Sequence, residues 1–318
     1  LAAPEQHRPR RRVRPQRGLR RVTAALCRPI EAAAAECHLF RIPHGLRGAR
    51  GPGRLQSVNG PLAWPAELGR VDRGMAQRSV QTTGSAAPDR PVLRLISTTD
   101  LHAHLRAYDY LTDRAVPGLG LAQAATLIRQ LRAERPGALL LDNGDFLQGS
   151  ALTDVMVEGP PGAASWPHPV IAAFQALGYD AAVLGNHEFN YGLEFLARAL
   201  ANARLPILGA NLQRPDGTPF AVPWVVIERQ IDTGAGAPLP LRIGVLGLLT
   251  PQVTDWDQAH LAGRLVSADI VETARAELPR LRAAGADLVV ALAHTGIGAR
   301  TARPGMENAA VPLAALPG

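Results

Sequence analysis

From Val92 onward, short apolar runs alternate with stretches whose apolar residues recur at helical spacing. The apolar runs predict strands at 92–97, 138–141, 181–184, 207–209, 224–230, 241–248 and 288–293. The helical spacing predicts helices at 119–134, 170–177, 193–203 and 270–284, the second of them ended by Gly178. Strands that alternate with helices predict an α/β fold with a largely parallel sheet covered by helices. The neighbouring runs 224–230 and 241–248 are joined by Gly- and Pro-rich residues and predict an antiparallel hairpin, so the sheets should be mixed.

Residues 1–90 show neither period and are dominated by Arg, Pro and Gly, which predicts a disordered segment ahead of one domain at 91–318. This segment holds 17 Arg and 6 acidic residues, whereas 91–318 holds 17 Arg and 21 acidic residues. The basic charge therefore belongs to the front segment. Because almost no aromatic residues interleave with its arginines, we expect a solvated tail and no nucleic-acid polymer as partner. The first methionine is Met75, which suggests upstream sequence or a wrong start over 1–74.

Both cysteines, Cys27 and Cys37, lie in the front segment, so thiolate ligands are excluded in 91–318. No apolar run reaches the ~18 residues of a membrane-spanning helix, and charged residues interrupt the only stretches that resemble a signal peptide. We therefore expect no membrane association, and we expect a monomer. Without a visible signal peptide, a cytoplasmic location stays open.

Candidate chemistry gathers where four predicted strands end. Asp100-Leu101-His102, Asn143-Gly144-Asp145, Gly185-Asn186-His187-Glu188 and His294 each follow an apolar run. If the first piece is extended, Asp100 and His102 share a face and Leu101 points into the core. Oxygen and nitrogen ligands at strand ends are typical of centres that hold two hard or borderline metal ions, and one carboxylate such as Asp145 can bridge the two. His187 should point elsewhere than Asn186, toward the phosphoryl group of a substrate or its leaving oxygen.

Each residue also has a simpler interpretation. Asp142, Asn143 and Asp145 suit a plain turn, Asn186 suits a helix cap, and a lone His294 is more often a satisfied core histidine. All of these simpler interpretations would have to be true at once, for residues that stand at strand ends and in one order along the chain. We therefore favour a metal centre. Other candidates lack a partner at useful spacing: surface or supporting roles are expected for His104, His168 and His260, and Trp256-Asp257 is interpreted as a packing anchor followed by a turn carboxylate.

The order of the motifs D-x-H, G-D, G-N-H-E and H resembles the calcineurin-like metallophosphoesterases. It is most similar to the 2′,3′-cyclic-nucleotide 2′-phosphodiesterase/3′-nucleotidase branch of the 5′-nucleotidase family. The resemblance spans about residues 92–318, and the string Gly-Asn-His-Glu-Phe-Asn-Tyr-Gly at 185–192 is its most specific part. It implies a four-layer α/β/β/α sandwich with mixed sheets, nucleotide substrates and a periplasmic location.

The resemblance also implies the ligand set. Asp100 and His102 would bind one divalent ion, Asn186 and His294 the other, and Asp145 both, with Mn, Zn, Fe or Co as the metal. His187 would stabilise the transferring phosphoryl group and assist the leaving group. Asn190 stands where many 5′-nucleotidases have Asp, which favours the cyclic-phosphodiesterase branch. No substrate-binding residue is identified.

One departure bears on activity. The family carries a G-H-x-H element after the strand that holds the counterpart of His294, and a second domain that stacks the base, and neither occurs before Gly318. We therefore expect a domain incomplete at its C-terminus. Three functions stay open: hydrolysis of 2′,3′-cyclic nucleotides and 3′-nucleotides, a 5′-nucleotidase or UDP-sugar hydrolase, and a catalytically impaired fragment that lacks the last metal-binding histidines.

Overall fold

The computed structural model describes residues 35–41, 91–159, 167–233 and 236–317. Contacts within the chain separate two units, Leu1–Ala32 and Ala33–Gly318. The first unit lies outside the described residues, so the fold given below is that of the second.

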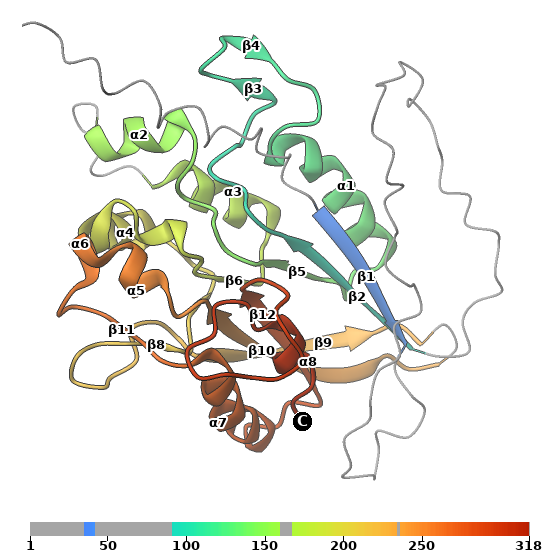
Figure 1. Ribbon diagram of the computed structural model, residues 1–318. Coiled ribbons are helices and arrows are strands. Elements are labelled where there is room, and N and C mark those ends of the chain that lie inside the picture. The colour runs from blue at the N-terminus through green and yellow to red at the C-terminus, as the bar shows by residue number, and fades with distance from the viewer. Residues whose placement is uncertain (1–34, 42–90, 160–166, 234–235, 318) are drawn as a thin grey trace, which may run out of the picture. The chain divides into compact units, whose positions relative to one another are not determined.

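The larger sheet has five strands in the order β1-β2-β5-β6-β7 (Figure 1). Its strands are β1 (Ala35–Arg41), β2 (Val92–Thr98), β5 (Leu139–Asp142), β6 (Ala181–Val183) and β7 (Ile207–Leu208). The last four are parallel to their neighbours, while β1 is antiparallel to β2. All four residues of β5 and all three of β6 are buried, as expected of parallel strands covered on both faces.

The second sheet has three strands in the order β12-β10-β9, comprising β9 (Trp224–Ile231), β10 (Leu239–Leu249) and β12 (Leu288–His294). Strands β9 and β10 form the predicted antiparallel hairpin, whereas β10 and β12 run parallel. The expectation of mixed sheets is confirmed.

The structure has four layers, with buried apolar side chains packed between them. One buried cluster lies between the sheets and joins Leu93 and Leu141 of the larger sheet to Ile243 and Val245 of the smaller. The helices over the outer face of the larger sheet are α1 (Leu121–Glu134), α3 (Pro169–Leu177) and α4 (Gly192–Leu200), and those over the smaller sheet are α7 (Ile270–Ala283) and α8 (Ala310–Ala314). The α/β/β/α sandwich is thereby confirmed (Figure 1).

Shorter elements connect the layers, and the sequence pattern did not predict them. They are β3 (Tyr108–Asp109), β4 (Arg114–Ala115), α2 (Ala151–Glu158), a 3-10 turn (His187–Phe189), β8 (Leu212–Gln213), α5 (Val253–Trp256), α6 (Gln258–Leu261) and β11 (Val266–Ser267). The β3–β4 hairpin projects beyond α1 and α2 (Figure 1).

Strand β1 differs from the expectation of disorder over 1–90. Its seven residues pair along the whole of β2, from Ala35 opposite Thr98 to Arg41 opposite Val92. The edge of β2 offers unpaired backbone groups, and 35–41 contains no Gly or Pro that would prevent pairing. The rest of the predicted tail lies outside the described residues, so its disorder stays a prediction.

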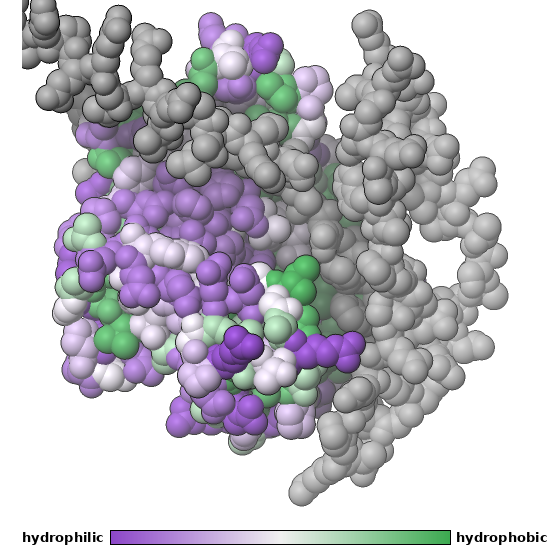
Figure 2. Space-filling view, in the orientation of Figure 1, coloured by the Kyte–Doolittle hydropathy of each residue, from purple (hydrophilic) through white to green (hydrophobic). Residues whose placement is uncertain are grey.

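The surface in view is mostly hydrophilic, with small apolar patches (Figure 2). This agrees with the placement of the large apolar side chains between the layers. Within the described part of the chain, no helix has the length and apolar character needed to cross a membrane.

Candidate metal centre

The predicted ligands lie in loops at the carboxyl ends of neighbouring parallel strands. Asp100 follows β2, Asp145 follows β5 and Asn186 follows β6, while His294 is the last residue of β12 in the other sheet. Because parallel strands end at the same edge of a sheet, the first three loops meet there. His294 reaches the same place from the second sheet, so both sheets contribute to the centre.

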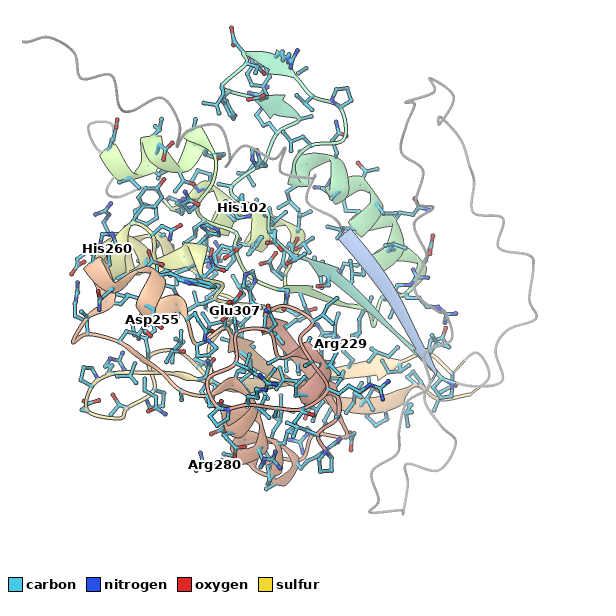
Figure 3. The ribbon with its side chains drawn as sticks, in the orientation of Figure 1. His102, Arg229, Asp255, His260, Arg280 and Glu307 are labelled. Carbon is cyan, nitrogen blue, oxygen red and sulfur yellow. The ribbon has the colours of Figure 1, made fainter. Side chains whose placement is uncertain are left out.

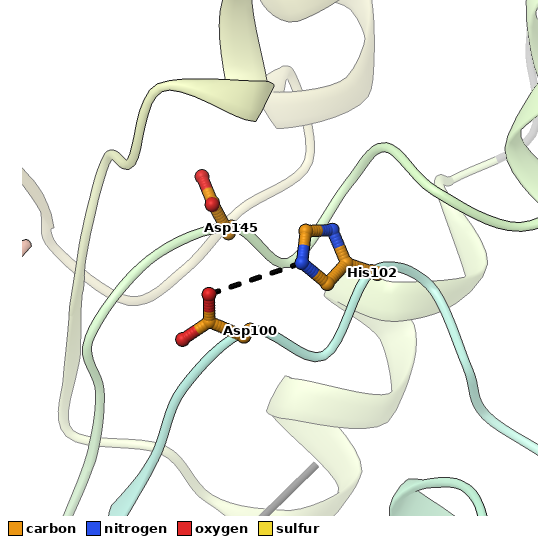
Figure 4. Close-up of side chains that lie close together, drawn as sticks. All are labelled: Asp100, His102 and Asp145. Carbon is orange, nitrogen blue, oxygen red and sulfur yellow. Dashed lines mark ion pairs between the residues drawn. The ribbon is translucent and has the colours of Figure 1, made fainter. Parts of the chain in front are cut away.

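A first set of donor atoms comes from Asp100, His102 and Asp145. One ligand atom from each of these residues lies within 4.8 Å of the others. The distance from His102 Nε2 to Asp100 Oδ1 is 3.8 Å (Figure 4). Asp145 is buried, whereas Asp100 is exposed, so this set is open to solvent on one side.

The local backbone differs from the extended chain predicted for Asp100-Leu101-His102. Leu101 is fully buried as expected, but Asp100 and His102 have φ of +53° and +46°, and Asp145 has φ of +59°. Such values are strained for residues with side chains and cluster at functional sites. Backbone hydrogen bonds hold the turn in place, from Asp100 N to Gly144 O (2.9 Å) and from His102 N to Asp145 O (2.8 Å).

A second set of donor atoms shares Asp145 with the first. His294 Nε2 lies 3.1 Å from Asp145 Oδ2 and 3.2 Å from Asn186 Oδ1. Asp145 therefore lies between both sets, which is where a bridging carboxylate is needed in a two-metal centre.

Both histidines are oriented by backbone carbonyls. His102 Nδ1 lies 2.7 Å from Gln148 O, and His294 Nδ1 lies 2.7 Å from Asn143 O. A carbonyl oxygen only accepts, so Nδ1 carries the proton in each ring and Nε2 faces the centre. Metal-binding histidines are commonly fixed in this way.

Asp145 and His294 form an ion pair in the structure. Burial alone would lower the pKa of His294, but the hydrogen bond and charge of Asp145 outweigh it and raise the pKa to about 9. Burial alone would raise the pKa of Asp145, but the hydrogen bond and charge of His294 lower it. The imidazolium proton thus occupies a place that a cation would take.

Glu188 holds two ligand loops together. Its carboxylate accepts backbone hydrogen bonds from Asp145 (2.9 Å), Phe146 (2.8 Å), Leu147 (2.9 Å) and Gly185 (2.6 Å). Burial, followed by the charge of Asp145, raises the pKa of Glu188 to about 7 against the opposing effect of these amides. The sequence analysis gave this residue no role, although its place in the motif at 185–192 was a signal that it matters.

Two glycines leave room for the ligands. A Cβ atom on Gly185 would overlap Asp145 Oδ1, and one on Gly144 would lie 2.9 Å from His294 Nδ1. Gly144 also has φ of +96°, which a side chain would strain.

His187 lies beside the donor atoms. Its backbone N–H donates to Asp145 Oδ1 at 2.8 Å, and its ring stands edge-on to the ring of His102 with 5.1 Å between centroids. Its Nδ1 lies 2.6 Å from Asn190 Oδ1. The structure therefore brings all six predicted side chains together: Asp100, His102, Asp145, Asn186, His187 and His294.

The remaining candidates lie elsewhere. His168 is buried and caps α3, His104 is half-buried with no partner for Nδ1 among the described residues, and His260 is exposed on α6. The interpretation of Trp256 as a packing anchor is wrong, since this last residue of α5 is 52% exposed. Asp257 is not a plain turn carboxylate either, because it is buried and accepts hydrogen bonds from Asn190.

The donor set fits divalent cations. Two oxygen-bearing side chains, of Asp100 and Asn186, and the imidazoles of His102 and His294 surround Asp145, and such mixed sets suit borderline and hard metal ions. In the structure the His294 proton offsets part of the negative charge of Asp145, and a cation would replace that proton.

Comparison with known proteins agrees with this geometry. Residues 93–311 match the family model of the calcineurin-like phosphoesterases. The chain is 40% identical over 233 residues to the trifunctional nucleotide phosphoesterase protein YfkN of Bacillus subtilis, across 72% of this chain and 16% of that protein. It is 40% identical over 245 residues to the 2′,3′-cyclic-nucleotide 2′-phosphodiesterase/3′-nucleotidase of Haemophilus influenzae, across 76% of this chain and 36% of that protein.

A solved structure is similar as well. The crystal structure of the calcineurin-like phosphoesterase YfkN from Bacillus subtilis superposes with a TM-score of 0.64 and 38% sequence identity, covering 70% of this chain and 67% of that one. The chain spans only part of the two curated relatives, 16% of one and 36% of the other.

Proposed function

The chain belongs to the calcineurin-like phosphoesterase family, and from this premise we propose that it hydrolyses nucleotide phosphoesters at a centre for two divalent metal ions. The proposed substrates are 2′,3′-cyclic nucleotides, opened to 3′-nucleotides, and 3′-nucleotides, hydrolysed to nucleosides. The observation that carries the proposal is the position of Asp145 between two sets of donor atoms. The 40% identity to a relative named for both reactions supports the choice of substrate.

In this proposal Asp100, His102 and Asp145 hold one ion, and Asp145, Asn186 and His294 hold the other. Mn, Zn, Fe and Co all suit these ligands. When bound, the ions offset the charge of the phosphate and lower the pKa of the attacking water.

His187 is proposed to act on the substrate directly. Its Nδ1 is bonded to Asn190, which leaves Nε2 to contact the phosphoryl group or to give a proton to the leaving oxygen. The backbone N–H of His187 donates to Asp145 Oδ1, which fixes the main chain of His187 beside the proposed bridging ligand, and the bond to Asn190 orients the ring. A group that transfers a proton needs such a fixed position.

The experiment is a phosphate-release assay on the full chain with Mn²⁺, comparing 2′,3′-cyclic AMP, 3′-AMP and 5′-AMP. Because the cyclic substrate releases no phosphate until its ring is opened, the 3′-AMP intermediate is followed by chromatography. We expect hydrolysis of the first two with higher kcat/KM than for 5′-AMP. His187→Ala should lower kcat by about 10²- to 10⁴-fold, as for loss of a general acid, while Asp255→Asn should leave it unchanged.

A preference for 5′-AMP would favour a 5′-nucleotidase instead. No turnover of any of these substrates with Mn²⁺, Zn²⁺, Fe²⁺ or Co²⁺ would overturn the proposal.

A periplasmic location is proposed from the resemblance of the sequence to the family, and a monomeric state is proposed as well. Fractionation of the producing cells and light scattering of the purified chain test these two points. Recovery in the cytoplasmic fraction, or a dimer in solution, would contradict them.

A further inference from the structure

A chain of hydrogen bonds connects His187 to a buried carboxylate from a distant part of the sequence. His187 Nδ1 lies 2.6 Å from Asn190 Oδ1, and Asn190 Nδ2 lies 3.0 Å from Asp257 Oδ1 and 3.2 Å from Oδ2. Asp257 is 8% exposed and lies between α5 and α6, 67 residues beyond Asn190. Its carboxylate makes no capping bond to α6, so Asn190 is the partner that the structure gives it.

The chemistry of the three groups determines which group donates and which accepts in each of these hydrogen bonds. An ionised carboxylate only accepts hydrogen bonds, so Asp257 selects the NH₂ side of the Asn190 amide. The amide oxygen of Asn190 must then face His187, and an oxygen acceptor there requires the proton on Nδ1 of the ring. Nε2 of His187 is left as the nitrogen that faces the substrate.

Asn190 alone does not determine this outcome. An amide presents an acceptor on one side and a donor on the other, and either side fits the space. If the amide turned over, its NH₂ group would face His187 Nδ1 and would require the opposite tautomer, with the proton on Nε2. The orientation of the Asn190 amide is therefore selected by Asp257.

We infer that Asp257 is a positioning residue for His187: acting through Asn190, it fixes the ring orientation and holds the Nδ1–H tautomer. The consequence for catalysis rests on the proposed function, whereas the tautomer can be measured without it. The carboxylate that many 5′-nucleotidases place next to the corresponding histidine is here one residue further away, on a different element.

The first test is Asp257→Asn. The new side chain keeps the shape of aspartate and can still accept a hydrogen bond from Asn190. The midpoint of urea unfolding should therefore be the same as for the unsubstituted protein. The new side chain can also donate, which permits either orientation of the Asn190 amide. In ¹⁵N NMR of the metal-free protein, at a pH where the ring is neutral, His187 should change from one tautomer to a mixture. The His187 signal is identified by its loss in His187→Gln.

With substrate and Mn²⁺, Asp257→Asn should lower kcat by about 10- to 100-fold, as for removal of a group that orients a ligand or catalytic residue. The KM should change little, because no substrate contact is removed. The matched control is Asp255→Asn. It removes the same charge from the exposed side chain of Asp255, which lies on α5 two residues before Asp257 (Figure 3). It should change neither the tautomer nor kcat.

The second test exchanges the two side chains. Asn190→Asp alone sets two carboxylates against each other and should impair the protein. In Asn190→Asp with Asp257→Asn, the amide at 257 donates to the carboxylate at 190, which accepts from His187 Nδ1. This double variant should restore the single tautomer and most of kcat.

The outcomes are separable. A single Nδ1–H tautomer in Asp257→Asn, with an unchanged kcat, would overturn the inference. If the unsubstituted chain hydrolyses no phosphoester, the proposed function fails, and the tautomer measurement alone then decides on Asp257.

Discussion

At the scale of the residue, Glu188 determines how two ligand loops face each other. Four backbone amides from the loops after β5 and β6 converge on its two oxygens, and the side chain is 1% exposed. Two of these amides belong to Asp145 and to Gly185, the neighbour of Asn186. The position of the proposed bridging ligand thus depends on a carboxylate that offers no atom to the centre itself.

We predict that Glu188→Gln destabilises the fold by about 2 kcal/mol or more and weakens metal binding by about 10- to 100-fold. The glutamine NH₂ group would face backbone N–H groups, which leaves buried donors unpaired at about 1–3 kcal/mol each, and outer groups of this kind commonly affect metal affinity to that extent. Urea unfolding and Mn²⁺ titration measure the two effects. The control is Glu194→Gln, whose exposed pair with Arg264 should contribute less than about 1 kcal/mol. Equal unfolding midpoints for the two variants would contradict the prediction.

The sequence predicted the residues of the centre better than their geometry. Asp145, Asn186 and His294 could be found because each follows an apolar run, and strand ends meet in parallel sheets. The left-handed turn at Asp100 and His102 has no such signature, because hydrogen bonds to the 144–146 loop impose it. The role of Asp257 depends on a partner 67 residues away, which no local pattern contains.

At the scale of the element, segments with a clear apolar run or helical period were predictable, including the short β6 and β7, whereas the short connecting elements were not. Helix α1 and strands β2, β10 and β12 carry enough apolar residues to show a period, and each of their observed bounds lies within two residues of the predicted one. Strands β8 and β11 have two residues each and pair with one another, and β8 also bridges to Pro219. Their formation depends on tertiary structure and not on local propensity.

The residue that caps helix α3 is a histidine, so the stability of the cap depends on pH. His168 precedes Pro169 at its start, and Nδ1 accepts from Val170 N at 3.3 Å. The side chain is buried, and burial lowers the pKa of His168 from 6.5 to about 4. Protonation would therefore both bury a charge and remove the acceptor that caps the helix.

We predict that the fold loses stability as the pH falls from about 6.5 toward about 4. In that window the unfolded chain binds a proton at His168 and the folded chain does not, so acid favours unfolding, by up to about 3 kcal/mol. The variant His168→Asn keeps a capping acceptor but does not titrate, so its stability should fall less over the same range. Urea unfolding at pH 7.5 and pH 5 measures both proteins. Parallel losses in the two would refute the assignment to His168.

At the scale of the whole molecule, the metal centre is a link between the two sheets. Asp145 comes from the larger sheet and His294 from the smaller, and their side chains meet at 3.1 Å. Apolar side chains hold the sheets together along their faces, whereas at their ends His294 joins the ligand loops of the larger sheet through Asp145, Asn186 and Asn143. Bound ions would therefore stabilise the sandwich as a unit and not one loop alone.

We predict that Mn²⁺ raises the temperature of unfolding and that EDTA reverses the rise. One site at a free-ion concentration 100-fold above its Kd adds about 2.7 kcal/mol, which for a domain of this size corresponds to a rise of about 5–10 °C. Asp145→Asn should abolish most of the rise because it removes a ligand from both donor sets. His102→Gln affects only the first set and should abolish part of it, while His260→Gln, on the exposed side of α6, should retain all of it. Thermal unfolding followed by circular dichroism gives the four values, and a rise that survives Asp145→Asn would mean that the ions bind elsewhere.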